Sequence, residues 1–129
     1  MPTHLHWISK PCDPFTVSEV LQSFASYTAH EILKALRSKG QDDWLAVFTD
    51  HAKPGKKHHI WQKPLAKNVY SKEFLYEKLE YIHSNPVNKK WHLVSDRADY
   101  GFSSACFYDR GEDSVIPIDD VRQMFVENG

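Results

Sequence analysis

A helix with a marked start and a marked end is the strongest structural signal in this chain of 129 residues. Ser71 is a residue type that caps helices, and proline disfavours helical backbone at the residue before it, so the helix must end close to Pro86. Between these limits Leu75, Leu79 and Ile82 recur at helical spacing and predict the side that faces the core. We therefore predict a helix that begins after Ser71 and ends about two residues before Pro86.

The first half of the chain predicts another long helix. Thr16 can cap its start, and Glu19 three residues later completes the pattern of a capping box. Gly40 is a residue type that ends helices. Short helices are also expected over residues 42–49 and 118–126.

Two segments are expected to be extended. Residues 1–8 are predicted to form a short strand, on which His4 and His6 point to one face and Leu5 points into the core. Residues 59–70 are predicted to be extended as well. The chain therefore combines strands with helices, and we see no internal repeat in it.

Composition excludes several classes of protein. Hydrophobic residues make up 41% and charged residues 26%, which is typical of a globular protein. No apolar run approaches the roughly 18 residues that a membrane span needs, so no membrane partner is expected. Cys12 and Cys106 form no C-x-x-C pair, and a reducing compartment, the cytoplasm, is expected.

Charge is distributed unevenly, although the net charge is only −1. Residues 53–90 hold nine lysines against three glutamates, and residues 109–129 hold six acidic residues against two arginines. A basic middle with an acidic tail suits a protein that holds phosphates on one surface. A solvated lysine-rich face explains the same distribution equally well.

His4 and His6 are candidate metal ligands. On a strand their spacing points both imidazoles to one face, where they can bind one divalent cation at adjacent positions. The chain has eight histidines, and a pair close to a terminus is also compatible with a plain surface. The pair alone is weak support for a metal site.

The predicted helix after Ser71 carries a second candidate group. Tyr81 and Asn85 are one turn apart, so a phenol oxygen and an amide oxygen lie on one face, and Lys78 lies one turn before Tyr81. An amide oxygen can complete a metal site begun by two imidazoles. A tyrosine on a helix is more often a packing residue, and asparagine before proline is more often a turn former.

Taken together, these motifs resemble those of a known family. The opening string Met-Pro-Thr-His-Leu-His resembles the Met-Pro-x-His-hydrophobic-His string of single-tyrosine HUH transposases, particularly the REP-associated tyrosine transposase branch. Trp61-Gln62 resembles the Trp-Gln pair of that branch, and residues 81–87 resemble its Tyr-Ile-x-x-Asn-Pro-Val signature. Residues 99–105 are similar to its Tyr-x-Tyr-Ser-Ser segment, with Phe102 in place of the second tyrosine.

The resemblance implies a fold and an activity. The fold would be α+β, an antiparallel sheet flanked by helices like the RNA-recognition or ferredoxin-like palm, and incomplete at the N-terminus. His4, His6 and Asn85 would hold Mg²⁺ or Mn²⁺, and Tyr81 would be the nucleophile that cuts and rejoins single-stranded or hairpin DNA. A 5′-phosphotyrosine would be the intermediate, and the protein would associate with the nucleoid.

Other expectations concern the DNA, the domain bounds and the assembly. The catalytic domain would span residues 1–108, followed by an acidic tail over residues 109–129, and a homodimer is left open. A line of lysines with one tryptophan among them could follow the DNA backbone and stack a base. The candidate DNA-binding residues are Lys56, Lys57, Trp61, Lys63, Lys67 and Lys78.

The sequence also departs from the family pattern. The family domain normally has a strand, a helix and another strand before the His pair, whereas this chain starts at the methionine of the motif. One alternative is therefore a truncated or domesticated remnant that binds single-stranded or hairpin DNA without catalysis. Another is a small metal-binding domain unrelated to DNA.

Overall fold

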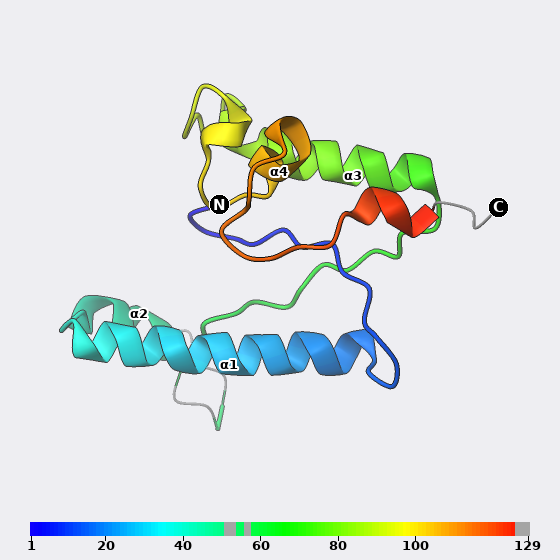
Figure 1. The fold of residues 1–129 in the computed structure, drawn as a ribbon. Helices are drawn as coiled ribbons and strands as arrows, with labels where there is room; N and C mark the ends of the chain where they lie inside the picture. Colours follow the sequence, from blue (N-terminus) through cyan, green and yellow to red (C-terminus); the bar gives the residue numbers. More distant parts are fainter. Residues whose placement is uncertain (51–53, 56–57, 126–129) are drawn as a thin grey trace. The chain divides into compact units, whose positions relative to one another are not determined.

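The structure of the protein is a computed structural model that describes residues 1–50, 54–55 and 58–125. Over these residues the regular elements are helices and short 3-10 turns, joined by irregular segments (Figure 1). In chain order the elements are α1 (Val17–Ser38), α2 (Asp42–Asp50), α3 (Lys72–Ser84), η1 (Asn85–Val87), η2 (Arg97–Asp99), α4 (Ala105–Arg110) and η3 (Val121–Phe125).

The expected α+β fold is wrong, because the described part of the chain contains no strand and therefore no antiparallel sheet. A strand needs a hydrogen-bonded neighbour, and no described segment pairs with residues 1–8. The burial of residues 4–8 still alternates, but Leu5 is 52% exposed and does not enter the core as predicted. Residues 59–70 also lack strand structure, and Pro64 removes one of the donors that a ladder would use.

The chain divides into two compact units. The first unit combines Met1–Ile8 with Lys67–Gly129, and the second unit is Ser9–Ala66. The predicted domain boundary after residue 108 stays a prediction, and α4 runs across it. None of the helices in the described residues has the length and apolar character that crossing a bilayer requires.

In the first unit α3 has the predicted bounds. The Ser71 hydroxyl accepts a hydrogen bond from the Phe74 amide at 3.2 Å, as an N-cap does. Leu75 is 1% exposed and belongs to the core of this unit, while Asn85 and Pro86 begin the 3-10 turn η1 where α3 ends. The cap and the proline thus define this helix as the sequence predicts.

Side chains of α3 hold η2 and α4 in place. Arg97 of η2 donates to Glu80 of α3 at 2.6 Å and makes a two-point contact with Asp109 of α4 at 2.6 and 2.9 Å. His83 of α3 is 2% exposed, and its Nε2 lies 2.9 Å from the hydroxyl of Ser104 at the start of α4. The polar contacts therefore fix the side of α3 that faces α4.

The second unit is built on α1. The capping box of Thr16 and Glu19 is present as predicted, and Gly40 has a φ of 63° just beyond the end of the helix. Trp61 packs on α1, because its indole N–H donates to the Thr28 hydroxyl at 2.9 Å and its ring lies 5.8 Å from that of Phe24.

The predictions for the short elements are mixed. The helix expected over residues 42–49 is present as α2. The expected helix over residues 118–126 is described only as the 3-10 turn η3. The helix α4 was not predicted.

Candidate active site

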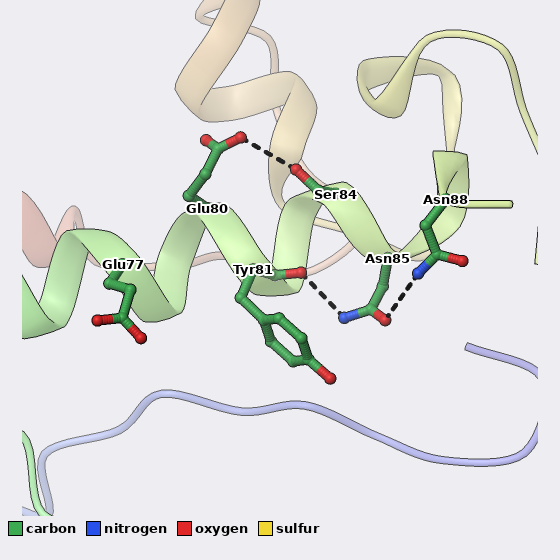
Figure 2. Close-up of a pocket in the computed structure, with 6 residues that line it drawn as sticks. All are labelled: Glu77, Glu80, Tyr81, Ser84, Asn85 and Asn88. Atoms are coloured by element: carbon green, nitrogen blue, oxygen red, sulfur yellow. Dashed lines mark hydrogen bonds between the residues drawn. The ribbon is translucent and has the colours of Figure 1, made fainter. Parts of the chain in front are cut away.

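A hollow of about 400 Å³ opens on one side of α3 and η1 (Figure 2). Ser84 and Asn85 follow Tyr81 by three and four residues, so both lie next to it on the helix surface. The residues that line the hollow are Glu77, Glu80, Tyr81, Ser84, Asn85 and Asn88.

Tyr81 is 57% exposed, so its phenol is open to a substrate. In Figure 2 the phenol projects away from α3 toward the side on which the N-terminal segment runs. The ring of His6 lies 5.5 Å from the ring of Tyr81 in an edge-on arrangement, at an interplanar angle of 81°. The first unit therefore brings the predicted nucleophile together with one of the predicted ligands.

The two histidines of the pair lie against each other. Their ring centroids are 4.9 Å apart, and His4 also packs 5.4 Å from the ring of Trp91. The Nε2 atom of His6 is buried and has no hydrogen-bond partner. Leaving a buried polar atom unpaired is costly, so this nitrogen is the one in the site that a ligand would satisfy.

The surroundings of His6 favour its neutral form. Burial lowers the pKa of His6 below its usual value, and the nearby His4 and the N-terminal ammonium lower it further. Neutral imidazole is the form that binds metal ions.

Asn85 is 5% exposed, and its side chain has a defined orientation. The amide nitrogen donates to the carbonyl oxygen of Tyr81 at 2.9 Å, and the amide oxygen accepts a longer contact from Asn88 at 3.4 Å (Figure 2). The oxygen, which is the atom that could bind a cation, thus has only the longer contact with Asn88.

His4, His6 and Asn85 offer nitrogen and oxygen atoms of the kinds that bind divalent cations. The described residues contain no cluster of three or more histidine, cysteine, aspartate or glutamate side chains suited to a metal. A cation here would be held by the two imidazoles of His4 and His6 with the amide oxygen of Asn85. The unpaired Nε2 of His6 is the structural observation that supports this set.

Two carboxylates at the hollow are partly neutralised. Arg97 bonds Glu80 and holds the pKa of that carboxyl below its usual value, with a second contribution from the Ser84 hydroxyl. Glu77 pairs with Lys78 at 2.6 Å. A phosphate that enters the hollow would thus meet less negative charge than the side chains alone suggest.

The described DNA-binding candidates are divided between the two units. Lys56 and Lys57 lie outside the described residues. Trp61 and Lys63 belong to the second unit, where Lys63 is exposed and the Trp61 indole is engaged by Thr28, whereas Lys67 and Lys78 belong to the first. Lys67 is exposed, and the Lys78 ammonium lies 4.8 Å from the ring of Phe74.

Some residues of the site were not predicted. Glu77 and Ser84 stand four residues before and three after Tyr81, and Glu80 stands three after Glu77 and four before Ser84, so helical spacing could have found them. Trp91 beside His4 could not have been found in this way, because its approach depends on how residues 88–91 turn back after α3.

Comparisons with protein-family models, with characterised proteins and with solved structures find no significant match to this chain. The resemblance to HUH transposases rests on its motifs alone.

Proposed function

We propose that this protein cuts and rejoins single-stranded or hairpin DNA through a covalent bond to Tyr81, with the help of a divalent metal ion. The motifs around His4, His6 and Tyr81 support the proposal by their resemblance to single-tyrosine HUH transposases. The physical support is an exposed phenol beside a half-buried imidazole whose buried Nε2 has no hydrogen-bond partner.

His4, His6 and Asn85 would hold Mg²⁺ or Mn²⁺. When bound, the cation would offset the negative charge on the oxygens of the reacting phosphate. The Asn85 amide nitrogen donates to the carbonyl of Tyr81, which leaves the amide oxygen as the atom that would bind the cation in place of its longer contact with Asn88. The same hydrogen bond ties this ligand to the residue that carries the nucleophile.

The proposed reaction is an exchange of phosphate esters. The Tyr81 oxygen forms a bond to phosphorus while the bond from phosphorus to the 3′ oxygen breaks, and the 3′ oxygen takes up a proton to become a hydroxyl. The phenol proton passes to water, to which the exposed side chain has access. The 5′-phosphotyrosine keeps an ester bond, so a 3′-hydroxyl can reverse the step and rejoin the strand without another source of energy.

The proposed substrate is a single strand or a hairpin. The reactive phenol must reach one phosphate beside α3, which an unpaired strand presents more freely than a duplex does. The proposal places the protein at the nucleoid. It holds for a monomer and for a homodimer alike, because His6 and Tyr81 meet within one chain.

The alternative is a protein that binds single-stranded or hairpin DNA without cutting it. One observation favours this alternative. The family carries its His pair on a sheet, and the described residues of this chain contain no strand. A metal site that is less rigid than the family's would hold the cation less tightly.

The test is the formation of a covalent adduct. The protein is incubated with labelled hairpin DNA and Mn²⁺ and then run on a denaturing gel. We expect a labelled protein band that is abolished in Tyr81→Phe, because phenylalanine keeps the ring and lacks the attacking oxygen. The matched control is Tyr76→Phe, which changes a tyrosine on the same helix that does not line the hollow and should keep the band.

The other outcomes separate the two candidates. DNA binding that weakens with salt, without any adduct, would support the non-catalytic alternative. A band that persists in Tyr81→Phe would overturn the assignment of the nucleophile.

A further inference from the structure

The segment just before α3 carries an exposed aromatic ring that is already stacked. Tyr70 is 77% exposed, and its ring lies 4.9 Å from that of Phe74 with an interplanar angle of only 10°. Phe74 covers one face of the tyrosine ring. The high exposure of Tyr70 means that its other face is open to solvent.

Lysines lie near this pair of rings, and one of them, Lys78, is also paired with Glu77 at 2.6 Å. The ammonium of Lys78 lies 4.8 Å from the centre of the Phe74 ring, and Lys72 lies 5.8 Å from the centre of the Tyr76 ring. Lys67 is exposed three residues before Tyr70. Aromatic rings interleaved with lysines suit a single-stranded nucleic acid, whose bases stack and whose phosphates are negative.

The stacked rings lie on the same side of α3 as the candidate nucleophile. Phe74, Lys78 and Tyr81 are four and three residues apart, so they follow one stripe along the helix. Phe74 and Tyr81 are two turns apart, about 10 Å along the axis. That distance corresponds to about three stacked nucleotides and to fewer when the strand is extended.

We infer that Tyr70, backed by Phe74, is a stacking site for an unpaired base of single-stranded DNA, close to the phosphate that Tyr81 would attack. This inference rests on the proposed function for its substrate class. Because Phe74 already supports the ring from behind, Tyr70 would lose little freedom when a base stacks on its open face. Lys67 and Lys78 would then lie close to the phosphates of the same strand.

Binding and cleavage are measured separately, so that each can fail alone. Binding of a labelled oligothymidylate of about a dozen nucleotides is measured by fluorescence anisotropy with the Tyr81→Phe protein as parent, in which no adduct can form. We expect Tyr70→Ala in this parent to weaken binding by about 5- to 150-fold, the range that loss of one stacked base gives. Tyr70→Phe keeps the ring and should retain the affinity of the parent.

The matched control is Tyr27→Ala, which removes a similarly exposed tyrosine from α1 of the second unit and should leave binding unchanged. A second measurement replaces one thymine at a time by 5-bromouracil and maps the photo-cross-link by mass spectrometry. A cross-link at Tyr70 supports the site, and so does equal binding of oligouridylate, since stacking tolerates either sugar.

Unchanged binding in Tyr70→Ala, a cross-link confined to other residues, or equally tight binding of duplex DNA would each overturn the stacking site. If the oligonucleotide binds through Tyr70 and the unmodified protein forms no adduct, the proposed cleavage fails and the stacking site stands. If an adduct forms and Tyr70→Ala binds normally, the stacking site fails and the proposed cleavage stands.

Discussion

Two histidines of the first unit have lowered pKa values because both are removed from water, and their surroundings differ. His6 faces Tyr81 and has a buried nitrogen without a partner. The Nε2 of His83 lies 2.9 Å from Ser104, and its ring lies 5.2 Å from that of Tyr108. At the scale of single residues, an unsatisfied imidazole marks the candidate site and a satisfied one marks the packing of α3 against α4.

His83 should make folding sensitive to acid. Burial lowers its pKa, and the charge of Arg97 lowers it further, against the opposing effect of Asp109 and Glu80. The unfolded chain, with a histidine pKa of about 6.5, therefore binds more protons, and stability rises with pH through this window. This contribution is fully present above pH of about 6.5 and is lost as the pH falls toward the lower pKa of the folded state.

Urea unfolding between neutral and mildly acidic pH measures this effect. We expect His83→Gln, which cannot titrate but can still bond Ser104, to lose less stability on acidification than the parent does. Ser104→Ala should lower the free energy of unfolding by about 1–3 kcal/mol at neutral pH, because it leaves a buried imidazole nitrogen unpaired. An identical pH dependence in His83→Gln would show that other groups control it.

His6 should be needed for metal binding. Removing a residue that only hydrogen-bonds a metal ligand already lowers metal affinity by about 10-fold or more. Removing the ligand itself should lower it at least as much. We therefore expect His6→Ala to weaken Mn²⁺ binding by more than about 10-fold in titration calorimetry. The control is His92→Asn, which changes an exposed histidine of the same unit with a φ of 41°, a conformation that asparagine tolerates. Equal Mn²⁺ binding by both variants would rule out the proposed ligand set.

At the scale of elements, the sequence predicted helices well wherever a local cap marks them. Thr16 with Glu19, and Ser71 with Phe74, act within four residues, so the pattern alone contains the interaction. The strand expected over residues 1–8 failed because a strand depends on a partner that local alternation does not specify.

The contacts that join α3, η2 and α4 lay beyond prediction from local patterns. Arg97 is separated by 17 residues from Glu80 and by 12 from Asp109. Nothing in the spacing of these three residues predicts that one guanidinium bonds both carboxylates. Only the fold of the first unit brings them together.

Arg97 should therefore stabilise the first unit. Its side chain is 26% exposed, and the loss of both ion pairs in Arg97→Ala should lower the free energy of unfolding by about 1–2 kcal/mol, less than for a buried network. Lys34→Ala is the control, because it removes an exposed pair with Glu31 on α1 and should cost under about 0.5 kcal/mol. Equal losses in chemical denaturation would show that the Arg97 contacts add nothing beyond an ordinary surface pair.

At the scale of the whole molecule, the sequence predicted part of the candidate site and missed the architecture around it. His4, His6, Tyr81 and Asn85 all belong to the first unit, although more than 70 residues separate the His pair from the tyrosine. Local spacing explains why Tyr81 and Asn85 share a face of α3. The approach of His6 to Tyr81 depends on how the opening segment packs, and the family resemblance suggested it on the basis of a sheet that the described residues do not form.

The uneven charge of the molecule leads to a last prediction. The net charge of −1 would not attract DNA, so the proposed DNA binding would depend on lysines concentrated in one part of the chain. Lys63 and Lys67 are exposed. If each lysine contacts one phosphate when single-stranded DNA binds, changing both to alanine should reduce the slope of log affinity against log salt by about 1.4, at about 0.7 for each contact.

A double variant of equal charge provides the control. Lys34→Ala with Lys39→Ala removes two lysines near the end of α1, outside the lysine-rich residues 53–90. Anisotropy of a labelled oligothymidylate over a series of salt concentrations should show the original slope in this control and a reduced slope in the Lys63 and Lys67 variant. Equal slopes in the two double variants would mean that DNA affinity depends only on the total charge of the protein. The lysine-rich segment would then be an ordinary solvated surface.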